Sequence, residues 1–400
     1  MILSRRWSCC RHRRSGAGAA ATVADPGHLL VTNDFPPKRG GIQSYLWELW
    51  RRLPAGQATV LTTAYPEAAA FDAAQPFRIV RVKSKVLLAS PALARRVRSL
   101  ADATGAGLVL LDPALGVGLL GPWLERPFGV VVHGAEVTVP GRLPGARQAL
   151  AAVLRQAAVV VAAGDYPATQ AALVAGRALP GLIVVPPGVD AGRFRPLDAG
   201  DRERLRRLLG VVGAGALIVS VSRLVPRKGM DVLIEAASRL APSRTGLTVL
   251  VGGGGRDRAR LERLVARTRA PVRFLGPVAD EDLAGLYGAA DVFAMLCRDR
   301  RGGLEEGFGI VFLEAAACGV AQVAGASGGV ADAVEHGRTG LLVDRPRDPA
   351  AVAAALAELV DDPARRAALG QAARQRAVDH FDYDRLAAHL ATALALAVTR

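Results

Sequence analysis

Short apolar runs recur along this chain, and segments with the apolar spacing of helices separate them. The first run, at 28–32, leads through a glycine-containing loop into a helical pattern at 42–53. Strands that are apolar throughout and alternate with helices are typical of a parallel sheet covered on both faces. We expect the further strands of this first series at 58–62, 77–82, 108–111, 129–132, 158–162 and 182–185.

A second series of the same kind follows a polar, arginine-rich interruption at 191–212, which contains one helical segment at 201–209. Because 400 residues are too many for one ordinary core, two domains are expected. The expected strands lie at 216–222, 247–252, 272–275, 291–296, 320–324 and 340–343. The expected helices lie at 229–240, 256–269, 280–289, 309–317, 330–336, 348–359, 363–379 and 383–398.

The simplest architecture is therefore α/β, with two Rossmann-like, doubly wound parallel-sheet domains that face a central cleft. In open sheets of this kind, ligands bind outside the carboxyl ends of the strands. We expect a disordered basic tail at 1–26, an N-terminal domain at 27–195 and a C-terminal domain at 196–378. A final helix at 379–400 is expected to pack back toward the N-terminal domain.

The chain is basic, with a net charge of +15, and a bound anion, an anionic membrane or a nucleic acid would each account for part of this. No nucleic-acid motif is present and aromatic residues make up only 5%, which argues against a nucleic-acid partner. No apolar run reaches the ~18 residues that a membrane span needs. The cysteines lack metal-ligand spacing, which favours a reduced, cytoplasmic setting: Cys9, Cys10, Cys297 and Cys318.

Two loops at expected strand ends carry features of a phosphate site. Gly40 and Gly41 follow the first strand and open a helix, where paired glycines let a phosphate approach the backbone. Arg223 and Lys228 lie in the loop after the first strand of the second series, and two cations fixed there suit a diphosphate. The alternatives are a plain tight turn for the glycines and a solvated charge run for the cations.

Glu306-Gly-Phe-Gly-Ile-Val-Phe-Leu-Glu314 follows another expected strand, and its glycines open into a helix whose N-terminus would bind an anion. A carboxylate at each end suits a ligand with phosphates and sugar hydroxyls; surface charges are the alternative. His133 ends an apolar strand, where it would donate a hydrogen bond or serve a structural role. The glycine run at 252–255 lacks the Gly-x-Gly-x-x-Gly pattern, since Asp257 replaces the last glycine, so a dinucleotide cofactor is rejected.

Together these motifs resemble, in order, the retaining glycosyltransferases of the GT-B fold, family GT4, over essentially the whole chain after residue 27. Thr32–Tyr45 and the segment from Cys297 into the Glu306 motif resemble the PimB type, the actinobacterial mannosyltransferases that elongate phosphatidylinositol mannosides. The resemblance implies donor contacts at Gly40, Gly41, Arg223, Lys228, Val278, Gly307, Phe308, Gly309, Ile310 and Glu314. It implies catalytic roles for His133, Glu306, Arg223 and Lys228, and acceptor contacts at Gln43, Asp34 and Tyr45.

Within these roles, Gly41, Arg223 and Lys228 would hold the diphosphate and Glu314 the ribose. Glu306 and the backbone amides after it would hold the transferred sugar, and His133 would line its reaction face. For Tyr45, packing in the core or at the surface is an alternative of at least equal weight.

The resemblance implies transfer of the second mannose, in α-1,6 linkage, from GDP-mannose to a phosphatidylinositol mannoside, by a retaining front-face attack. No bound metal is expected to be required, and stimulation by Mg²⁺ is left open. Another nucleotide sugar, a small polyol acceptor such as inositol phosphate, and a catalytically silent scaffold protein are the alternatives. Cations at 78–85 and 93–100 predict peripheral contact with anionic lipid at the inner face of the plasma membrane, or else a solvated basic surface.

Overall fold

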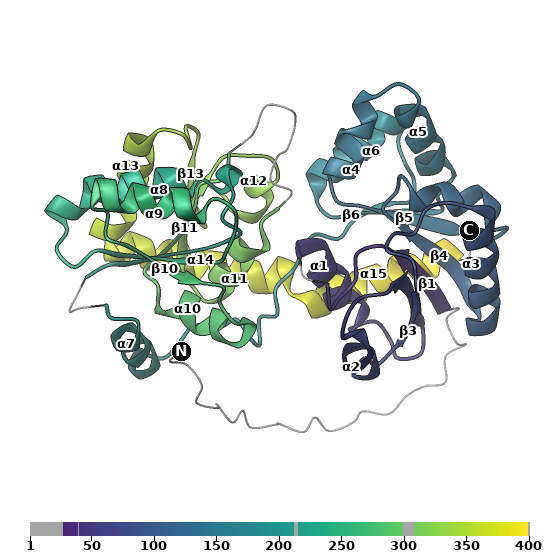
Figure 1. The fold of residues 1–400 in the computed structure, drawn as a ribbon, viewed down its shortest axis with the longest axis horizontal. Helices are drawn as coiled ribbons and strands as arrows, with labels where there is room; N and C mark the ends of the chain where they lie inside the picture. The colour runs from purple at the N-terminus through teal and green to yellow at the C-terminus, as the bar shows by residue number, and fades with distance from the viewer. Residues whose placement is uncertain (1–26, 39, 212–214, 299–307, 399–400) are drawn as a thin grey trace.

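The computed structural model describes residues 27–38, 40–211, 215–298 and 308–398, and the chain forms two parallel sheets (Figure 1). The first sheet has the strand order β3-β2-β1-β4-β5-β6-β7. Its strands are β1 Gly27–Thr32, β2 Ala58–Thr63, β3 Arg78–Val82, β4 Ala106–Asp112, β5 Phe128–Val132, β6 Val159–Ala162 and β7 Leu182–Val184. Its helices are α1 Gly41–Trp50, α2 Ala68–Ala73, α3 Pro91–Thr104, α4 Ala135–Thr138, α5 Ala146–Gln156 and α6 Asp165–Ala175, with 3-10 turns η1 Val117–Trp123 and η2 Pro140–Arg142.

The second sheet has the strand order β10-β9-β8-β11-β12-β13. Its strands are β8 Leu217–Val221, β9 Thr248–Gly252, β10 Val272–Gly276, β11 Val292–Met295, β12 Ala321–Gly325 and β13 Gly340–Val343. The helices of this half are α7 Ala199–Leu208, α8 Met230–Leu240, α9 Arg258–Thr268, α10 Leu283–Ala289, α11 Ile310–Ala317, α12 Val330–Ala333, α13 Pro349–Asp361 and α14 Pro363–Phe381. Three 3-10 turns complete it: η3 Pro226–Lys228, η4 Ala241–Ser243 and η5 Asp280–Asp282.

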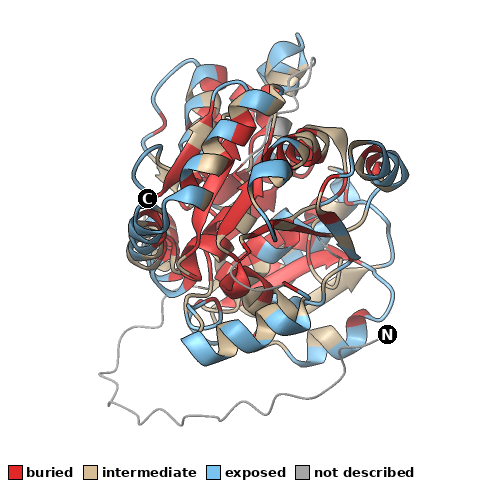
Figure 2. Ribbon diagram, turned by 90° about the vertical axis from the view of Figure 1, so that its left-hand side faces the viewer, coloured by how far each residue is buried: buried red, intermediate tan, exposed pale blue. Residues whose placement is uncertain are grey.

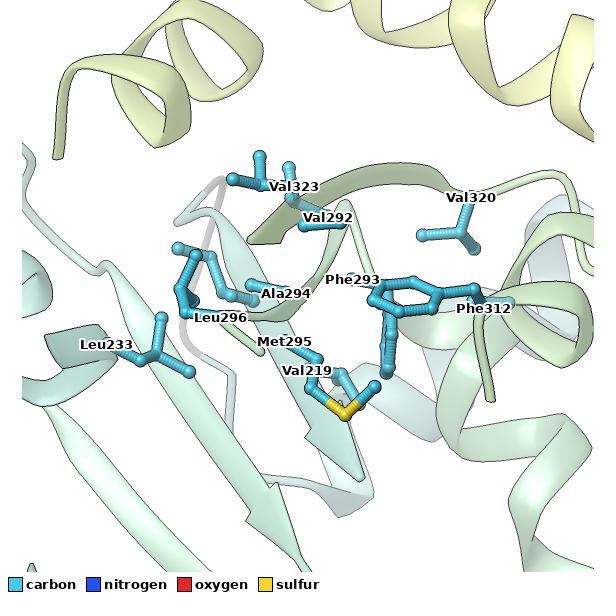
Figure 3. Close-up of a cluster of buried hydrophobic side chains, with 14 of the residues drawn as sticks. Val219, Leu233, Val292, Phe293, Ala294, Met295, Leu296, Phe312, Val320 and Val323 are labelled. Carbon is cyan, nitrogen blue, oxygen red and sulfur yellow. The ribbon is translucent and has the colours of Figure 1, made fainter. Parts of the chain in front are cut away.

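The inner strands are buried on both faces, which explains their continuous apolar sequences, whereas the edge strands β3 and β10 are partly exposed (Figure 2). In β1, Leu29 and Val31 belong to one hydrophobic cluster and Leu30 to another, because successive side chains of a strand point to opposite faces. In the second sheet, Phe293 of β11 packs edge-on against Phe312 of α11, with ring centroids 5.6 Å apart (Figure 3). This contact fixes α11 against the strand that precedes it.

The chain crosses between the two sheets twice, and the two crossings lie side by side. The backbone N–H of Val189, on the outward crossing, donates to the carbonyl of Phe381, and the N–H of Tyr383 donates to the carbonyl of Val189. Helix α15 (Tyr383–Val398) then runs across to the first sheet, where it packs in one cluster with α1 (Figure 1). The domain boundaries at 195/196 and 378/379 stay a proposal; the second lies within α14, three residues before the crossing at Phe381–Tyr383.

The structure departs from the expected elements at α12, which ends at Ala333 instead of at 336. Val334 adopts an extended conformation, and Gly337, with a φ of 72°, turns the chain toward β13. The arginine-rich segment at 191–212 also forms ion pairs with the second sheet. Arg202 and Arg206 donate to Asp291 at 2.7 and 2.9 Å, so part of the positive charge is structural.

Candidate active site

Loops at the carboxyl ends of the two sheets meet at helix α6. A Cβ atom on Gly164 would lie 3.3 Å from Asp332 Oδ2 and 3.9 Å from Phe308 Cδ2, both in the second half of the chain. The backbone N–H of Tyr166 donates to the Asp332 carboxylate. Burial and the nearby Asp165 raise the pKa of Asp332. The strand-end loops that carry the predicted site residues therefore belong to edges that face each other.

The glycine loop after β1 is held together by its own polar side chains. Asp34 Oδ1 accepts hydrogen bonds from Gln43 Nε2 at 2.5 Å and from Lys38 Nζ at 2.6 Å. A Cβ on Gly40 would meet the end of the Gln43 side chain, so a larger residue there would require that side chain to move. A Cβ on Gly41 would meet no protein atom within 4 Å, so packing within the protein does not require glycine at this exposed position.

His133 follows β5 and is tied to the protein on several sides. Its Nε2 lies 2.8 Å from Asp112 Oδ1, and its ring meets the ring of Tyr45 edge-on at 5.6 Å. The Glu136 carboxylate accepts the backbone N–H of His133. Burial alone would lower the pKa of His133, but the carboxylates of Asp112, Glu136 and Asp34 outweigh it, and the pKa is raised.

The predicted cations lie at the carboxyl end of β8. Arg223 is exposed, whereas Lys228 is buried at the end of η3, where Gly229 takes a left-handed conformation with a φ of 69°. A Cβ at position 229 would collide with the carbonyl of Leu296. The glycine thus lets the loop after β8 lie directly against the loop after β11.

The glycine run at 252–255 supports the Arg223 loop. Backbone N–H groups of Ser222 and Leu224 donate to the carbonyls of Gly252 and Gly254 at 3.0 and 2.8 Å. A Cβ at Gly253 would overlap the carbonyl oxygen of Ser222. These glycines therefore allow two backbones to run in contact, which is a structural reason for the run that needs no dinucleotide.

Glu314 lies in α11, half-buried, and accepts a hydrogen bond from the hydroxyl of Tyr287 at 2.8 Å. Burial raises the pKa of Glu314 to about 7, although this hydrogen bond and the nearby Arg193 act in the opposite direction. Arg193 is itself paired with Asp280, at 2.9 Å. The carboxylate thus stands in a poorly solvated place, where a ligand hydroxyl would stabilise its charge.

Residues 201–376 match the family model described as glycosyl transferases group 1. Over 376 residues, the chain is 40% identical to the GDP-mannose-dependent alpha-(1-6)-phosphatidylinositol monomannoside mannosyltransferase of Mycobacterium tuberculosis, covering 91% of this chain and 96% of that protein. The chain belongs to the group 1 glycosyltransferases.

This group 1 glycosyltransferase is also similar to a second curated relative and to a solved structure. The D-inositol 3-phosphate glycosyltransferase of Salinispora arenicola is 43% identical over 217 residues, which cover 50% of this chain and 46% of that protein. The structure of Anabaena HepE in complex with UDP matches with a TM-score of 0.78 at 21% identity, over 92% of this chain and all of that one. The predicted GT-B fold, with two parallel-sheet domains, is confirmed.

Some of the predicted site residues lie in places that differ from expectation. Tyr45 is 1% exposed and its hydroxyl donates to the carbonyl of Val185, so it packs in the core and does not face an acceptor. The Phe308 side chain is buried against Phe381, which leaves its backbone as the group available for a ligand. Val278 lies beside Gly252, at the same sheet edge as Arg223.

Two of the predicted donor contacts lie at the start of helix α11, and two other predicted residues lie outside the described part of the chain. Gly309, with a φ of 85°, precedes Ile310, the first residue of α11. Glu306 and Gly307 lie outside the described residues. The roles assigned to all of these residues stay predictions.

The sequence reasoning missed the partners of the predicted residues. Asp112 contacts His133, and Thr32 donates to Asp112; their signal was a polar residue at the end of an apolar run, the same signal that pointed to His133 itself. Tyr287 and Arg193 are near Glu314, but they lie in a helix and in the arginine-rich crossing, where nothing local marks them.

In the described part of the chain, no group of three or more His, Cys, Asp or Glu side chains is placed to hold a metal ion, and the metal requirement stays a prediction. No described helix has the length and apolarity needed to cross a bilayer.

Proposed function

We propose that this glycosyltransferase moves mannose from GDP-mannose to a phosphatidylinositol mannoside, adding the second mannose in α-1,6 linkage with retention. The observation that carries the proposal is the 40% identity to the mycobacterial mannosyltransferase over 91% of the chain, because it spans both sheets and the loops between them. The inositol-phosphate transferase matches only 50% of the chain, which makes a small polyol the second candidate acceptor.

In the proposed reaction, the donor diphosphate lies at the end of β8. Its negative charge grows as the bond to mannose breaks, and Arg223 and Lys228 stabilise this charge from fixed positions. Glu314 accepts hydrogen bonds from the ribose. Glu306 and the backbone amides that follow it hold the mannose, and the leaving phosphate takes the acceptor proton on the same face. Residues of the protein thereby supply the positive charge that the leaving group needs.

The proposed membrane contact is a docking loop, residues 83–88, between β3 and α3. Lys83 and Lys85 are exposed there, and Val86 and Leu88 are 52% and 67% exposed. Cations beside exposed apolar side chains suit an anionic lipid surface. The Asn33 side chain donates to the carbonyl of Leu87 at 3.2 Å and accepts its N–H at 2.7 Å, which ties the docking loop to the glycine loop. A lipid acceptor held at this surface would therefore lie near Asp34 and Gln43.

Two other cations in these predicted basic segments, Arg81 and Arg98, already have carboxylate partners. Arg81 donates to both oxygens of Asp72 at 2.7 and 2.8 Å, and Arg98 is paired with Glu125. The apolar face of α3 is buried, while Arg95 and Arg96 are exposed. The proposed surface therefore consists of the docking loop with these two arginines.

The function is tested by transfer of radiolabelled mannose from GDP-mannose to phosphatidylinositol monomannoside, with UDP-sugars as competitors. We expect a dimannoside product, and a loss of about 100-fold in kcat/KM in Arg223→Ala, since one fixed charge on a leaving group is removed. Arg267→Ala, an exposed arginine of α9, is the matched control and should retain wild-type activity. Product from inositol phosphate alone would replace the lipid by a small polyol, and failure both to transfer and to hydrolyse donors would favour a scaffold protein.

The membrane contact is tested by sedimentation with vesicles of phosphatidylcholine containing increasing phosphatidylinositol. The double variant Lys83→Glu, Lys85→Glu should bind at least about tenfold more weakly, because each surface cation contributes about 1 kcal/mol. Arg263→Glu, Arg267→Glu in α9 makes the same change of charge in the other half of the molecule. Equal binding by the two double variants would contradict the docking loop.

A further inference from the structure

Asp112 is a buried carboxylate to which neither the motifs nor the proposed transfer assigns a role. It is the last residue of β4 and is 1% exposed. Its Oδ1 lies 2.8 Å from His133 Nε2, and its Oδ2 accepts the Thr32 hydroxyl at 2.6 Å. A buried carboxylate without a counter-charge is costly, so its partners are expected to compensate it. His133 is the partner that is able to carry positive charge.

The orientation of the His133 ring follows from this contact. An ionised Asp112 only accepts hydrogen bonds, so the proton between the two groups belongs to Nε2. None of the described residues forms a hydrogen bond with Nδ1. His133 therefore has one nitrogen committed to the core and one left for a ligand. A second proton on Nδ1 makes the ring a cation and neutralises the charge of Asp112.

The Asp112 contacts continue into the loop that carries the predicted acceptor residues. The Thr32 hydroxyl, which donates to Asp112, accepts the backbone N–H of Asp34 at 2.9 Å. Asp34 in turn accepts from Gln43 and Lys38. One carboxylate therefore anchors both the histidine after β5 and the loop after β1.

We propose that Asp112 is a positioning residue of the sugar transfer, which holds His133 as an imidazolium with Nδ1–H directed to an oxygen of the transferred sugar. The step that Asp112 assists involves no change in its own bonds. It fixes the ring, neutralises its charge and keeps a donor on Nδ1. The proposal rests on the proposed function in one respect, that His133 lines the reaction face of the sugar.

Two other carboxylates near His133 also raise its pKa, and the test has to distinguish their effect from that of Asp112. Glu136 of α4 and Asp34 of the glycine loop also raise the pKa of His133, and Tyr45 of α1 covers one side of its ring. Asp112 is the carboxylate that the ring contacts directly. Asp112→Asn keeps the size and an oxygen acceptor for Nε2–H and removes the charge, while its amide group replaces the oxygen that accepts the Thr32 hydroxyl.

The test is the titration of His133 by NMR of its imidazole nitrogens in the full-length, ligand-free protein, with His133→Gln to assign the signals. In Asp112→Asn, the midpoint should fall by at least about one pH unit, since a carboxylate in contact shifts a pKa by this much or more. With GDP-mannose, kcat should fall about tenfold at neutral pH and recover at lower pH, while KM for the donor changes less.

Asp291→Asn is the matched control, because Asp291 is also a well-buried carboxylate paired with cations, in the second sheet. It should lower the melting temperature without moving the His133 titration or the pH profile. An unchanged His133 midpoint in Asp112→Asn would overturn the proposal, and so would a loss of activity that lower pH does not restore. If the wild type does not transfer mannose, the proposed function fails, while the titration still decides whether Asp112 sets the charge of His133.

Discussion

At the scale of single residues, Glu314, the predicted ribose contact, carries a cost in stability. Its folded-state pKa of about 7 lies above the ordinary carboxyl value of 4.5, so folding favours the protonated form. The stabilising contribution is fully present below a pH of about 4.5 and is lost as the pH rises through about 7. A ligand hydroxyl that binds the carboxylate would recover part of this loss.

Glu314→Gln removes the titration and keeps an acceptor for the Tyr287 hydroxyl. We expect the ligand-free variant to exceed the wild type in free energy of unfolding by about 1 kcal/mol at pH 8 and by less at pH 5. This is smaller than the full pKa shift would give, because solvent screens the half-buried carboxylate. Affinity for GDP should fall about tenfold, because a neutral amide replaces a charged acceptor. Urea unfolding at both pH values and GDP titration calorimetry measure these effects. A wild type and variant that differ equally at the two pH values would refute the assigned pKa.

At the scale of elements, the glycine run after β9 shows how a loop is positioned by its neighbour. Gly253 has a φ of 120° and touches the carbonyl of Ser222, whereas a Cβ on Gly254 would lie 3.8 Å from Pro277, at an ordinary contact distance. Gly253→Ala should destabilise the protein by about 2 kcal/mol and displace Arg223, with weaker GDP binding. Gly254→Ala, one residue away, should change both quantities little. Thermal unfolding and GDP calorimetry compare the two, and equal effects would count against close backbone contact as the reason for the run.

The elements were largely predictable because most of the parallel strands are buried on both faces and have continuous apolar sequences. The pairing of Asp112 with His133 was not predictable, because it depends on β4 lying beside β5 in a register that pairs Leu111 with Val130. Neither residue carries this information locally. The core position of Tyr45 likewise depends on Val185, 140 residues away along the chain.

At the scale of the whole molecule, the two halves of the site belong to different sheets, and the chain connects them in two places. The glycine loop, His133 and the docking loop belong to the first sheet, and Arg223, Lys228 and Glu314 to the second. The bond from Tyr166 to Asp332 joins the two halves at the strand-end loops. The arrangement of the predicted catalytic groups therefore depends on how the two sheets lie relative to each other as much as on either sheet.

The paired crossings at Val189 and Phe381–Tyr383 limit how that relation can change. Two chain crossings bonded side by side are expected to act as a hinge, which permits rotation of one domain about a line through the crossings and resists sliding of one domain past the other. Rotation displaces each atom in proportion to its distance from that line. A rotation of a few degrees about this line would therefore separate Asp332 from α6 and move Arg223 and Lys228, the predicted diphosphate contacts, away from His133.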